Sequence, residues 1–469
     1  MHSPSQAAGY RPDTPLLALS EWLADPVAAA RFPRHTLRWR NDRAAAEVGL
    51  DPLPDEAWVR HFGQFEPLPD NLPTPLALRY HGHQFRVYNP ELGDGRGFLF
   101  AQLRDAGGRL LDLGTKGSGQ TPWSRAGDGR LTLKGAVREV LATEMLEALG
   151  VYTSRSFAVI ETGEALERGD EPSPTRSAVL TRLSHGHIRI GTFQRLLALE
   201  ERDHMEQLVD YCLTRFPGPP PPDDAPGRDE PAARLMHHVV ERLADLAASY
   251  TVAGFVHGVL NTDNMNVSGE SFDYGPWRFL PRWDGGFTAA YFDHAGLYAF
   301  GRQPEAIHWN CGQFAVALRL LTDAPPLIAA LERFAPLYEE ALHRRWCWRL
   351  GVVPQENADN AALFAASEAT MLEGLSPDVF FHRHRGGRAA TGDLADVLSH
   401  YSPVPSDHPY WDELDPIHMH IERVEAIWAA IDREDDWSPF HDTVAAIRRM
   451  GSALGPPPPP AGHRQSRGA

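Results

Sequence analysis

The chain has 469 residues, of which 42% are hydrophobic and 23% charged, and its formal net charge is −17 at pH 7. This length allows two or three units with their own cores, or one large bilobal enzyme, and the composition is that of an ordinary globular protein. The acidic balance argues against a general binder of nucleic acid or anionic membranes, although local basic patches could still bind phosphate.

The cysteine content and the N-terminus bear on the compartment. Cys212, Cys311 and Cys347 are far apart and form no CxxC pair, which argues against a disulfide framework and fits a reducing compartment. The N-terminal sequence MHSPSQAAGYRPDTP has no apolar signal core, and no run reaches the length of a membrane-spanning helix. We therefore expect a cytoplasmic protein without membrane or nucleic-acid partners.

The first half of the chain predicts strands around one major helix. Two short strands are expected within residues 97–116, GFLFAQL and RLLDLGTK, joined by a hairpin-type turn at RDAGG. Residues 131–150 have apolar side chains at three-to-four spacing and end at Gly150, which predicts a helix. Two further strands are expected, SFAVIETGE at 156–164 and SAVLTRLS at 177–184.

After residue 190 the patterns become helical. Helical periodicity covers residues 192–216, 232–255 and 311–324. The proline-rich stretch 216–231 predicts an extended, solvated connector between two helices, and the proline-rich end, 455–469, predicts a disordered tail. The sequence thus indicates a mixed lobe followed by a mostly helical one.

Two glycine-rich stretches of the first half are candidates for phosphate binding. In ELGDGRG, residues 91–97, Gly93 and Gly95 would admit a ligand close to the backbone and Arg96 could bind a phosphate, although the motif by itself favours a plain turn. In residues 113–139, Lys116 ends a predicted strand and Glu139 lies on the following helix. Kinase-like enzymes use such a pair to fix nucleotide phosphates. Glycines 117, 119, 127 and 129, with Arg125 and Arg130, surround it, and a solvated charged loop is the alternative.

A third candidate is TRLSHGHIRIGTFQ at 181–194, where Arg182 and Arg189 could hold phosphate oxygens or could simply be exposed. Histidine pairs occur at 81/83, 185/187, 382/384 and 418/420. No third ligand stands at a readable spacing from any pair, so hydrogen-bonded or surface histidines are favoured over metal sites.

The fourth candidate is GFVHGVLNTDNMNVSGESFDYGPWRFL, residues 254–280, which is either a turn-rich surface loop or a cation site. Asn264 and Asp273 offer the hard oxygen ligands that Mg²⁺ prefers. The stretch begins like a kinase catalytic loop, but Val259 stands where a kinase has its catalytic base. Asp263, beside Asn264, is the nearby carboxylate.

In order, the motifs YHGHQF, LGDGRG, LGTKGSGQTPWSRAGDGR, REVLATEMLEALGV, HIRIGTFQ, GFVHGVLNTDNMN, DYGPWRFL and RQPEAIHWN resemble those of the selenoprotein O family, over roughly residues 75–320. The resemblance implies an α+β, protein-kinase-like bilobal fold with an additional helical C-terminal region. It also implies a protein adenylyltransferase (AMPylator). Such an enzyme binds ATP flipped relative to kinases and transfers AMP to Ser, Thr or Tyr hydroxyls of proteins, and its own hydroxyls are among the candidate acceptors.

The family pattern assigns roles to matching positions of this sequence. Lys116 and Glu139 would form the ion pair, and Asp263 would be the general base. Asn264 and Asp273 would hold Mg²⁺, with Mn²⁺ as an alternative. The nucleotide would be lined by Gly93, Gly95, Arg96, Asp128 and Gly129, with Arg182 and Arg189 on its phosphates.

The chain departs from the family at its end, where the usual C-terminal selenocysteine or cysteine and the NP…VLRN stretch are missing. A phosphotransferase and a non-catalytic ATP-binding module are the rival functions. The expected organisation is an N-terminal extension (1–74), a nucleotide-binding lobe (75–195), a mainly helical lobe with the metal and base residues (196–350), a helical C-terminal region (351–454) and the tail (455–469).

Overall fold

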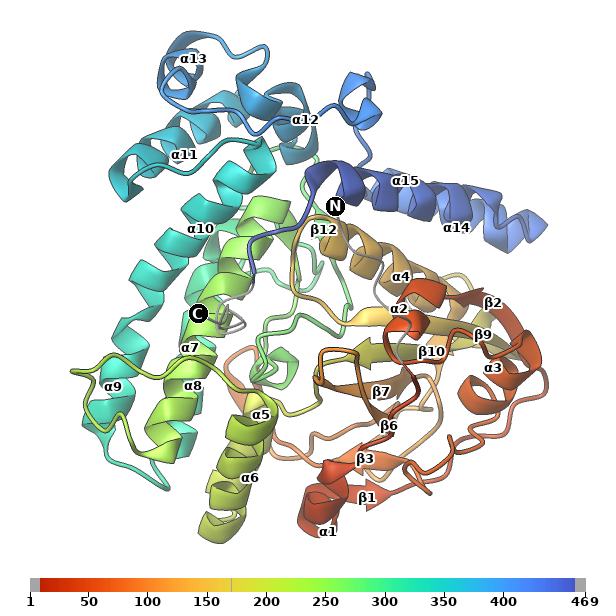
Figure 1. The fold of residues 1–469 in the computed structure, drawn as a ribbon. Helices are drawn as coiled ribbons and strands as arrows, with labels where there is room; N and C mark the ends of the chain where they lie inside the picture. Colours follow the sequence, from red (N-terminus) through yellow and green to blue (C-terminus); the bar gives the residue numbers. More distant parts are fainter. Residues whose placement is uncertain (1–8, 170, 460–469) are drawn as a thin grey trace.

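The computed structural model describes residues 9–169 and 171–459 and has a mixed α+β architecture. An antiparallel sheet built from the first 184 residues lies beside a mainly helical half, and further helices follow at the C-terminal end (Figure 1). The α+β class and the helical C-terminal region are therefore confirmed. In the described ranges, no helix combines the length and the apolar character needed to cross a membrane.

The main sheet has eight strands, of which seven follow the order β1-β3-β6-β7-β10-β9-β2 and β8 pairs separately with β10. Every pairing in it is antiparallel. The strands are β1 (Ala24–Pro26), β2 (Thr36–Arg40), β3 (Leu76–Leu78), β6 (Leu99–Arg104), β7 (Leu110–Lys116), β8 (Leu131–Thr132), β9 (Arg155–Leu166) and β10 (Thr175–Ser184). The four strands expected from the sequence are confirmed as β6, β7, β9 and β10.

Both faces of this sheet are buried, so its central strands carry nearly continuous apolar runs. Helix α4 (Leu133–Ala148) covers one face, where Leu180 of β10 joins its core. On the other face Val179 packs in a second core with α2 (Asp42–Glu47) and α3 (Asp55–Phe62). The alternation of neighbouring residues between two cores follows from the two-residue period of a strand.

The predicted helix within 131–150 is α4, and its ends have local causes. The Thr132 hydroxyl accepts a hydrogen bond from the Gly135 N–H at 3.0 Å, which caps the first turn. After its last residue the chain turns at Gly150 with a φ of +75°, a conformation that glycine adopts without strain. Glu139 stands in the middle of this helix and is completely buried.

The helical half is built around the long buried helix α7, against which α8, α9 and α10 pack. Short elements precede it and connect it to the sheet. The helices are α1 (Ser20–Leu23), α5 (Ile190–Ala198), α6 (Arg202–Arg215), α7 (Pro231–Ala253), α8 (Gln303–Leu318), α9 (Ala324–Glu332), α10 (Phe334–Leu350), α11 (Asn357–Met371), α12 (Pro377–Arg383), α13 (Gly392–Leu398), α14 (Ile421–Glu434) and α15 (Ser438–Leu454). Short 3₁₀ turns are η1 (Pro15–Leu19), η2 (Thr262–Asn264), η3 (Phe300–Arg302), η4 (Arg385–Gly387) and η5 (Pro409–Asp412), and the small strands are β4 (Gly82–Gln84), β5 (Val87–Asn89), β11 (Phe255–Val256) and β12 (Arg278–Phe279).

Two expectations for the helical half need correction. The helical pattern of residues 192–216 is split into α5 and α6, because the chain breaks at Glu200 with a φ of +55°. The proline-rich stretch 216–231 does connect two helices and is largely exposed, but it forms turns over residues 223–229 and is therefore not extended throughout. Its start is also fixed. The carbonyls of Phe216 and Pro217 accept hydrogen bonds from Arg242 of α7, at 2.7 and 2.9 Å. The buried guanidinium therefore fixes the start of the connector.

The C-terminal helices α14 and α15 lie along α4 of the sheet half (Figure 1). Arg448 of α15 grips the buried carboxylate of Glu144 on α4 in a bidentate ion pair, with distances of 2.7 and 2.8 Å. Lys134 at the start of α4 pairs with Glu425 of α14 at 2.7 Å. The helix that carries Glu139 is thus held from outside by the last helices of the chain. Residues 460–469 of the predicted disordered tail lie outside the described residues.

We expect Arg448→Ala to destabilise the fold by roughly 1–3 kcal/mol, because it leaves the buried Glu144 carboxylate short of its main partner. Urea denaturation would measure this loss. The matched control is Arg449→Ala on the same helix. Arg449 pairs with Glu413 at 2.8 Å but is half exposed, so this change should cost no more than about 0.5 kcal/mol. Equal effects of both variants would contradict the bracing role of Arg448.

Candidate active site

A cleft of about 480 Å³ lies between the sheet and the helical half and brings the four sequence candidates together. Its walls come from the loops around β6 and β7, from the end of β10, and from the stretch 259–276. The predicted site residues that line it are Gly93, Gly95, Arg96, Lys116, Asp128, Gly129, Arg182, Arg189, Asp263, Asn264 and Asp273. Glu139 is the one predicted site residue that does not line the cleft, because it is buried on α4 behind Lys116.

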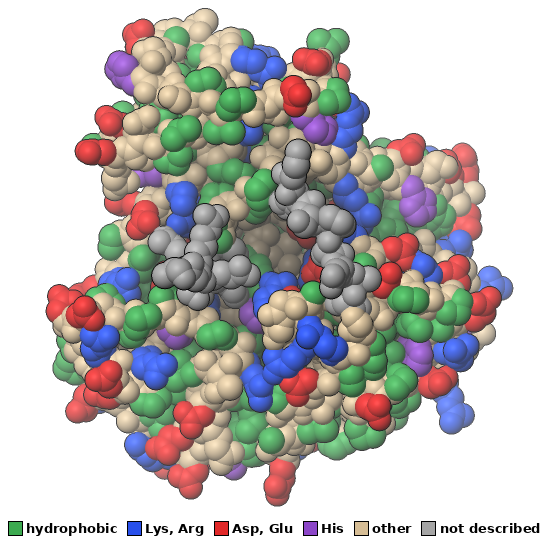
Figure 2. Space-filling view, in the orientation of Figure 1, with side chains coloured by type: hydrophobic (Ala, Val, Ile, Leu, Met, Phe, Trp, Pro, Cys, Tyr) green, Lys and Arg blue, Asp and Glu red, His purple; other side chains and the backbone are tan. Residues whose placement is uncertain are grey.

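The cleft is locally basic in an acidic protein. Seven basic residues and four acidic residues line it, whereas the whole chain carries a net charge of −17. Figure 2 shows Lys and Arg side chains gathered beside the hollow near the middle of one face. A cleft lined mainly by one sign of charge concentrates ligands of the opposite sign. This arrangement suits a small anion.

The Lys116 ammonium is the centre of the buried charges. It lies 2.7 Å from the Glu139 carboxylate on α4 and 2.9 Å from the Asp273 carboxylate on the opposite wall. All but about 4% of its side chain is buried, and a buried cation is tolerated only when it is paired. The strand–helix pair expected from the sequence is therefore formed, and Asp273 is its third member.

Asp273 faces several cations at once. Arg182 of β10 lies 3.5 Å from it, and Arg189 3.9 Å. Burial by itself would raise the pKa of Asp273, but Lys116, Arg182 and Arg189 outweigh it and hold the pKa well below its usual range. Asp273 is therefore an anion at any physiological pH. Its φ of +61° lies in the left-handed region, so its backbone is strained.

A network of buried hydroxyls holds the segment that carries Asp273. The Tyr274 hydroxyl bonds to Thr153 at 2.5 Å and to Ser271 at 2.6 Å, and Tyr250 of α7 also reaches Ser271, at 2.5 Å. Since Thr153 lies between α4 and β9, this network links the Asp273 segment to the sheet half. It offsets the backbone strain at Asp273.

Arg189 lines the cleft and also contacts several other residues of its wall. Its guanidinium lies between the rings of Tyr80 and Phe272, 4.5 and 4.8 Å from their centroids. It pairs with Asp94 at 3.0 Å and donates a hydrogen bond to the Asp263 carbonyl at 2.8 Å. The arginine expected to hold phosphate thus also fixes the backbone of the candidate base.

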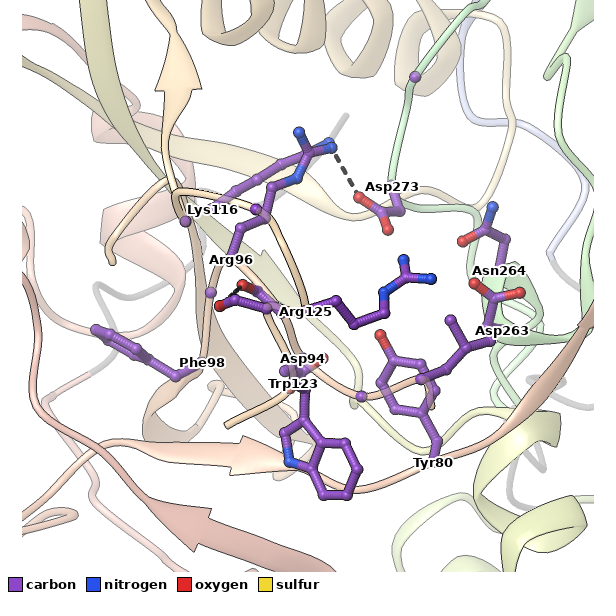
Figure 3. A pocket seen from close by; sticks show the side chains of 18 of the residues that line it. Tyr80, Asp94, Arg96, Phe98, Lys116, Trp123, Arg125, Asp263, Asn264 and Asp273 are labelled. Atoms are coloured by element: carbon purple, nitrogen blue, oxygen red, sulfur yellow. Dashed lines mark hydrogen bonds and ion pairs between the residues drawn. The ribbon is translucent and has the colours of Figure 1, made fainter. Parts of the chain in front are cut away.

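Asp263 points into the cleft opposite Lys116 and Arg96, with Arg125 reaching between them (Figure 3). Only 8% of its surface is exposed, and burial raises its pKa to about 6 although the Arg189 guanidinium opposes the shift. Within the described residues, its Oδ1 is buried with no hydrogen-bond partner. A buried acceptor without a donor is costly, so such an atom commonly marks a place where a ligand or proton donor binds.

We call residues 260–264, which carry the candidate base Asp263, the base loop. It is held from both halves of the molecule. In the small hairpin of β4 and β5, the N–H of His83 donates to the Thr262 hydroxyl at 2.7 Å and that of Phe85 to Asn261 Oδ1 at 3.0 Å. From α8, Asn310 donates to the Leu260 carbonyl at 2.8 Å. These bonds fix the residues on the N-terminal side of Asp263.

Asn264 and Asp273 are the expected metal ligands, and Figure 3 shows both at the same side of the cleft as Asp263. The Asn264 amide nitrogen donates to the Val259 carbonyl at 2.9 Å, which leaves the amide oxygen as its ligating end. No group of three or more His, Cys, Asp or Glu that could hold a metal occurs in the described ranges. A Mg²⁺ bound by one carboxylate, one amide oxygen, phosphate and water would need no such group.

The glycine-rich stretches form the remaining wall. A Cβ at Gly93 would lie 2.3 Å from the Trp123 ring, and one at Gly129 would lie 2.2 Å from the backbone of Gly119. The loops therefore pack on each other too tightly for any side chain. Asp128 lines the cleft, but Arg168 holds its carboxylate at 2.9 and 3.2 Å.

Sequence reasoning missed several cleft residues. Asp94 stands inside the GDGR motif that was singled out, and its role shows only through its contact with Arg189. Arg168 belongs to the β9–β10 connection and has no motif that could have revealed it. Tyr80 and Trp123 contribute aromatic faces. Arg125, noted among the basic residues of its stretch, does line the cleft and forms no ion pair within the part of the chain that the structure describes.

The histidine pairs are hydrogen-bonded or stacked, as favoured. His81 bonds to the Tyr88 hydroxyl at 2.6 Å and His187 to Asp112 at 3.0 Å, while His418 and His420 stack at 4.1 Å. His382 and His384 bond to the carbonyls of Tyr410 and Arg388, at 3.1 and 3.2 Å.

Comparison with known proteins agrees with this geometry. A family model described as "Protein adenylyltransferase SelO" matches residues 8–378. Three relatives are each named protein nucleotidyltransferase YdiU. That of Synechocystis sp. is 40% identical over 467 residues (92% of this chain, 97% of the relative), and that of Gloeobacter violaceus is 42% identical over 457 residues (91% and 92%). That of Synechococcus elongatus is 50% identical over 339 residues (71% and 66%). The motif resemblance is thereby confirmed.

The pH dependence of stability should reveal the protonation of Glu270, three residues before Asp273. Burial raises its pKa to about 8 from 4.5. The hydrogen bond that its carboxylate accepts from the His185 N–H, at 2.8 Å, opposes this shift. Between these values the folded state keeps a proton that the unfolded state has lost, so this group makes the protein less stable as pH rises from 4.5 to 8.

Glu270→Gln has no such proton to lose. We therefore expect its melting temperature, relative to that of the parent, to rise steadily from pH 5 to pH 8 in thermal denaturation. The exposed Glu339→Gln is the control and should show no such trend. A constant difference between Glu270→Gln and the parent across this range would show that Glu270 ionises normally.

Proposed function

The chain belongs to the protein adenylyltransferase SelO family and is a nucleotidyltransferase, and we propose that its cleft transfers AMP from ATP to Ser, Thr or Tyr hydroxyls of proteins, its own included. The observation that carries this proposal is the Asp263 carboxylate. It is buried, one of its oxygens has no partner in the described residues, and it opens onto a basic cleft sized for a nucleotide.

The cations of the cleft support nucleotide binding. Lys116, Arg182 and Arg96 would receive the phosphates, since they line one wall and carry the charge that phosphate oxygens need. Arg189, already committed to Asp94 and the base loop, would act on the phosphates from behind Asp263. Gly93, Gly95, Asp128 and Gly129 would line the rest of the nucleotide.

The chemistry requires a proton acceptor near the hydroxyl that attacks. The acceptor oxygen forms a bond to the α-phosphorus, and the bond from that phosphorus to the oxygen bridging to the β-phosphate breaks, so that pyrophosphate leaves. The hydroxyl proton passes to Asp263 as general base. Lys116 and the arginines offset the negative charge that develops on the phosphate oxygens.

We propose that Asn264 and Asp273 hold Mg²⁺, with Mn²⁺ as an alternative. The residues fit such an ion, because Asp273 is ionised and the Asn264 oxygen is left available by the bond from its nitrogen to Val259. When bound, the ion would draw electron density from the phosphates and favour departure of pyrophosphate.

Two alternatives are less favoured by the cleft. In a kinase-type phosphotransferase the base would stand at Val259, which lines the cleft but has no ionisable group. A pure ATP-binding module would have no use for a buried carboxylate with an unpartnered oxygen, which costs stability.

For the organisation of the chain, we propose a protein-kinase-like bilobal fold. Support comes from the lysine of a strand that pairs with a glutamate of a helix, across the cleft from the base and metal residues. The proposed lobes are residues 75–195 and 196–350, flanked by the extension 1–74, the helical region 351–454 and the tail 455–469.

We also propose a cytoplasmic location with ATP and proteins as partners, and neither membrane nor nucleic acid among them. All three cysteines are free and buried, and burial raises the pKa of Cys347 to about 12, so its thiol stays protonated. Buried, unpaired thiols suit a reducing compartment. The net charge of −17 repels polyanions outside the cleft.

The first test is the intact mass of the purified protein and of a general protein acceptor after incubation with ATP and Mg²⁺. We expect a gain of one adenylyl group on either one. A phosphoryl gain would replace this proposal with a kinase. Chelation of the metal with EDTA should prevent the gain.

The second test is Asp263→Asn, which keeps the shape of the side chain but removes the proton acceptor. We expect kcat for AMP transfer to fall by roughly 10²–10⁴-fold, while ATP affinity in calorimetry stays close to that of the parent. The control is Asp407→Asn, an exposed aspartate away from the cleft, which should change neither. Full activity of Asp263→Asn would remove this residue from the role of base.

A further inference from the structure

A row of four aromatic side chains leads from the base loop to the surface. The Tyr298 hydroxyl donates to Asn261 Oδ1 at 2.6 Å, two residues before Asp263. From Tyr298 the row continues to Phe85 at 5.1 Å between ring centroids, then to Phe292 at 5.8 Å and to Tyr291 at 5.1 Å. We call these four residues the aromatic row.

Exposure increases along the aromatic row. Tyr298 is 3% exposed, Phe292 42% and Tyr291 79%. Val87, two residues beyond Phe85 in the hairpin, is 70% exposed. Large apolar side chains exposed to this degree in one neighbourhood commonly mark a binding surface, whereas single ones need no explanation. The outer end of the row is such a neighbourhood.

Ion pairs lie beside the row, where one glutamate is shared by two arginines. Glu305 of α8 pairs with Arg86 at 3.1 Å and with Arg302 at 3.2 Å. The Arg86 guanidinium also covers the ring of Trp309, 5.4 Å from its centroid. The surface therefore offers apolar and aromatic contact to a partner, beside arginine and glutamate side chains that pair with one another.

The hairpin that presents Phe85 is held in a strained shape. Phe85 and Arg86 have φ values of +50° and +63°, in the left-handed region where glycine or asparagine is usual. Residues held this way persist only where surrounding contacts enforce them, and they gather at functional sites. Here the enforcing contacts are Asn261 and Tyr298 on one side and Glu305 and Trp309 on the other.

We propose that the outer end of the aromatic row, Phe292 and Tyr291, docks the acceptor protein through an apolar or aromatic side chain close in sequence to the modified hydroxyl. This inference rests on the proposed function. A protein whose hydroxyl reaches Asp263 has to cover the adjoining surface, and the row is continuous with the base loop. Aromatic side chains supply large contact area at little cost in conformational entropy, and they dominate many interfaces.

The test compares AMP transfer to two peptides of equal length and charge, each with one serine. In one peptide leucine and phenylalanine flank the serine, and in the other glutamine and asparagine do. We expect the parent to prefer the apolar peptide. Tyr291→Ser should raise KM for that peptide about tenfold with kcat unchanged, because it removes contact made equally in the ground and transition states. Phe292→Ser should act in the same direction, and KM for ATP should stay constant.

Leu372→Ser is the matched control, since Leu372 is 65% exposed but belongs to the end of α11. It should change neither peptide's KM. If the parent adenylylates proteins but prefers neither peptide, or if Tyr291→Ser leaves KM unchanged, the docking proposal fails while the proposed function stands. If the parent adenylylates neither proteins nor peptides, the proposed function fails and the docking proposal with it.

Two other occupants would give different results and would overturn the proposal. Binding to phosphatidylcholine vesicles that Tyr291→Ser abolishes, without a change in peptide KM, would assign the surface to lipid. A dimer in sedimentation velocity that Tyr291→Ser dissociates, again at constant KM, would assign it to a second copy of the chain.

Discussion

The Lys116 ammonium joins three parts of the chain that are far apart in sequence. It ends β7, contacts Glu139 in the middle of α4, and reaches Asp273 across the cleft. Because a buried ammonium is stable only when it is compensated, strand, helix and loop must keep their relative positions for the charge to be tolerated. The bracing of α4 by Arg448 and Lys134 acts on the same arrangement, since it fixes the helix that supplies Glu139.

The cleft carries more basic side chains than its own carboxylates can pair with. Asp273 meets Lys116, Arg182 and Arg189, while Arg96 and Arg125 form no ion pair in the described ranges. This surplus of positive charge favours an anion such as a triphosphate. The acidic remainder of the surface repels large polyanions. A small, mainly basic cleft within an acidic protein thus selects its ligands by size as well as by charge.

The local parts of this site could be predicted from the sequence, and the long-range parts could not. Strand periodicity placed Lys116, helical periodicity placed Glu139, and the cluster of oxygen-bearing residues placed Asn264 and Asp273, because each signal lies within a few residues. The pairing of Arg189 with Asp94, the split of residues 192–216 at Glu200 and the packing of α15 on α4 depend on contacts between distant segments. No pattern in one stretch encodes them. The motif resemblance covered the site, over roughly residues 75–320, and the family model ends at residue 378, so neither reaches α13, α14 and α15.

The loop around Asp263 and the stretch 280–299 differ in structure, and this difference fits the proposed division between chemistry and recognition. Asn261 and Thr262 are fixed by β4, by Tyr298 and by Gln194 of α5, so that Asp263 is held in place by side chains from several elements. Residues 280–299, which carry Phe292 and Tyr291, contain neither helix nor strand. They are anchored by backbone hydrogen bonds of Leu280, Trp283, Gly285 and Phe287 and by the Asp293 carboxylate. A site whose reactive groups sit on rigid supports keeps its geometry when a neighbouring loop changes. If the docking proposal holds, residues 280–299 could vary in sequence to suit different acceptors while the charged cluster around Lys116 stays the same.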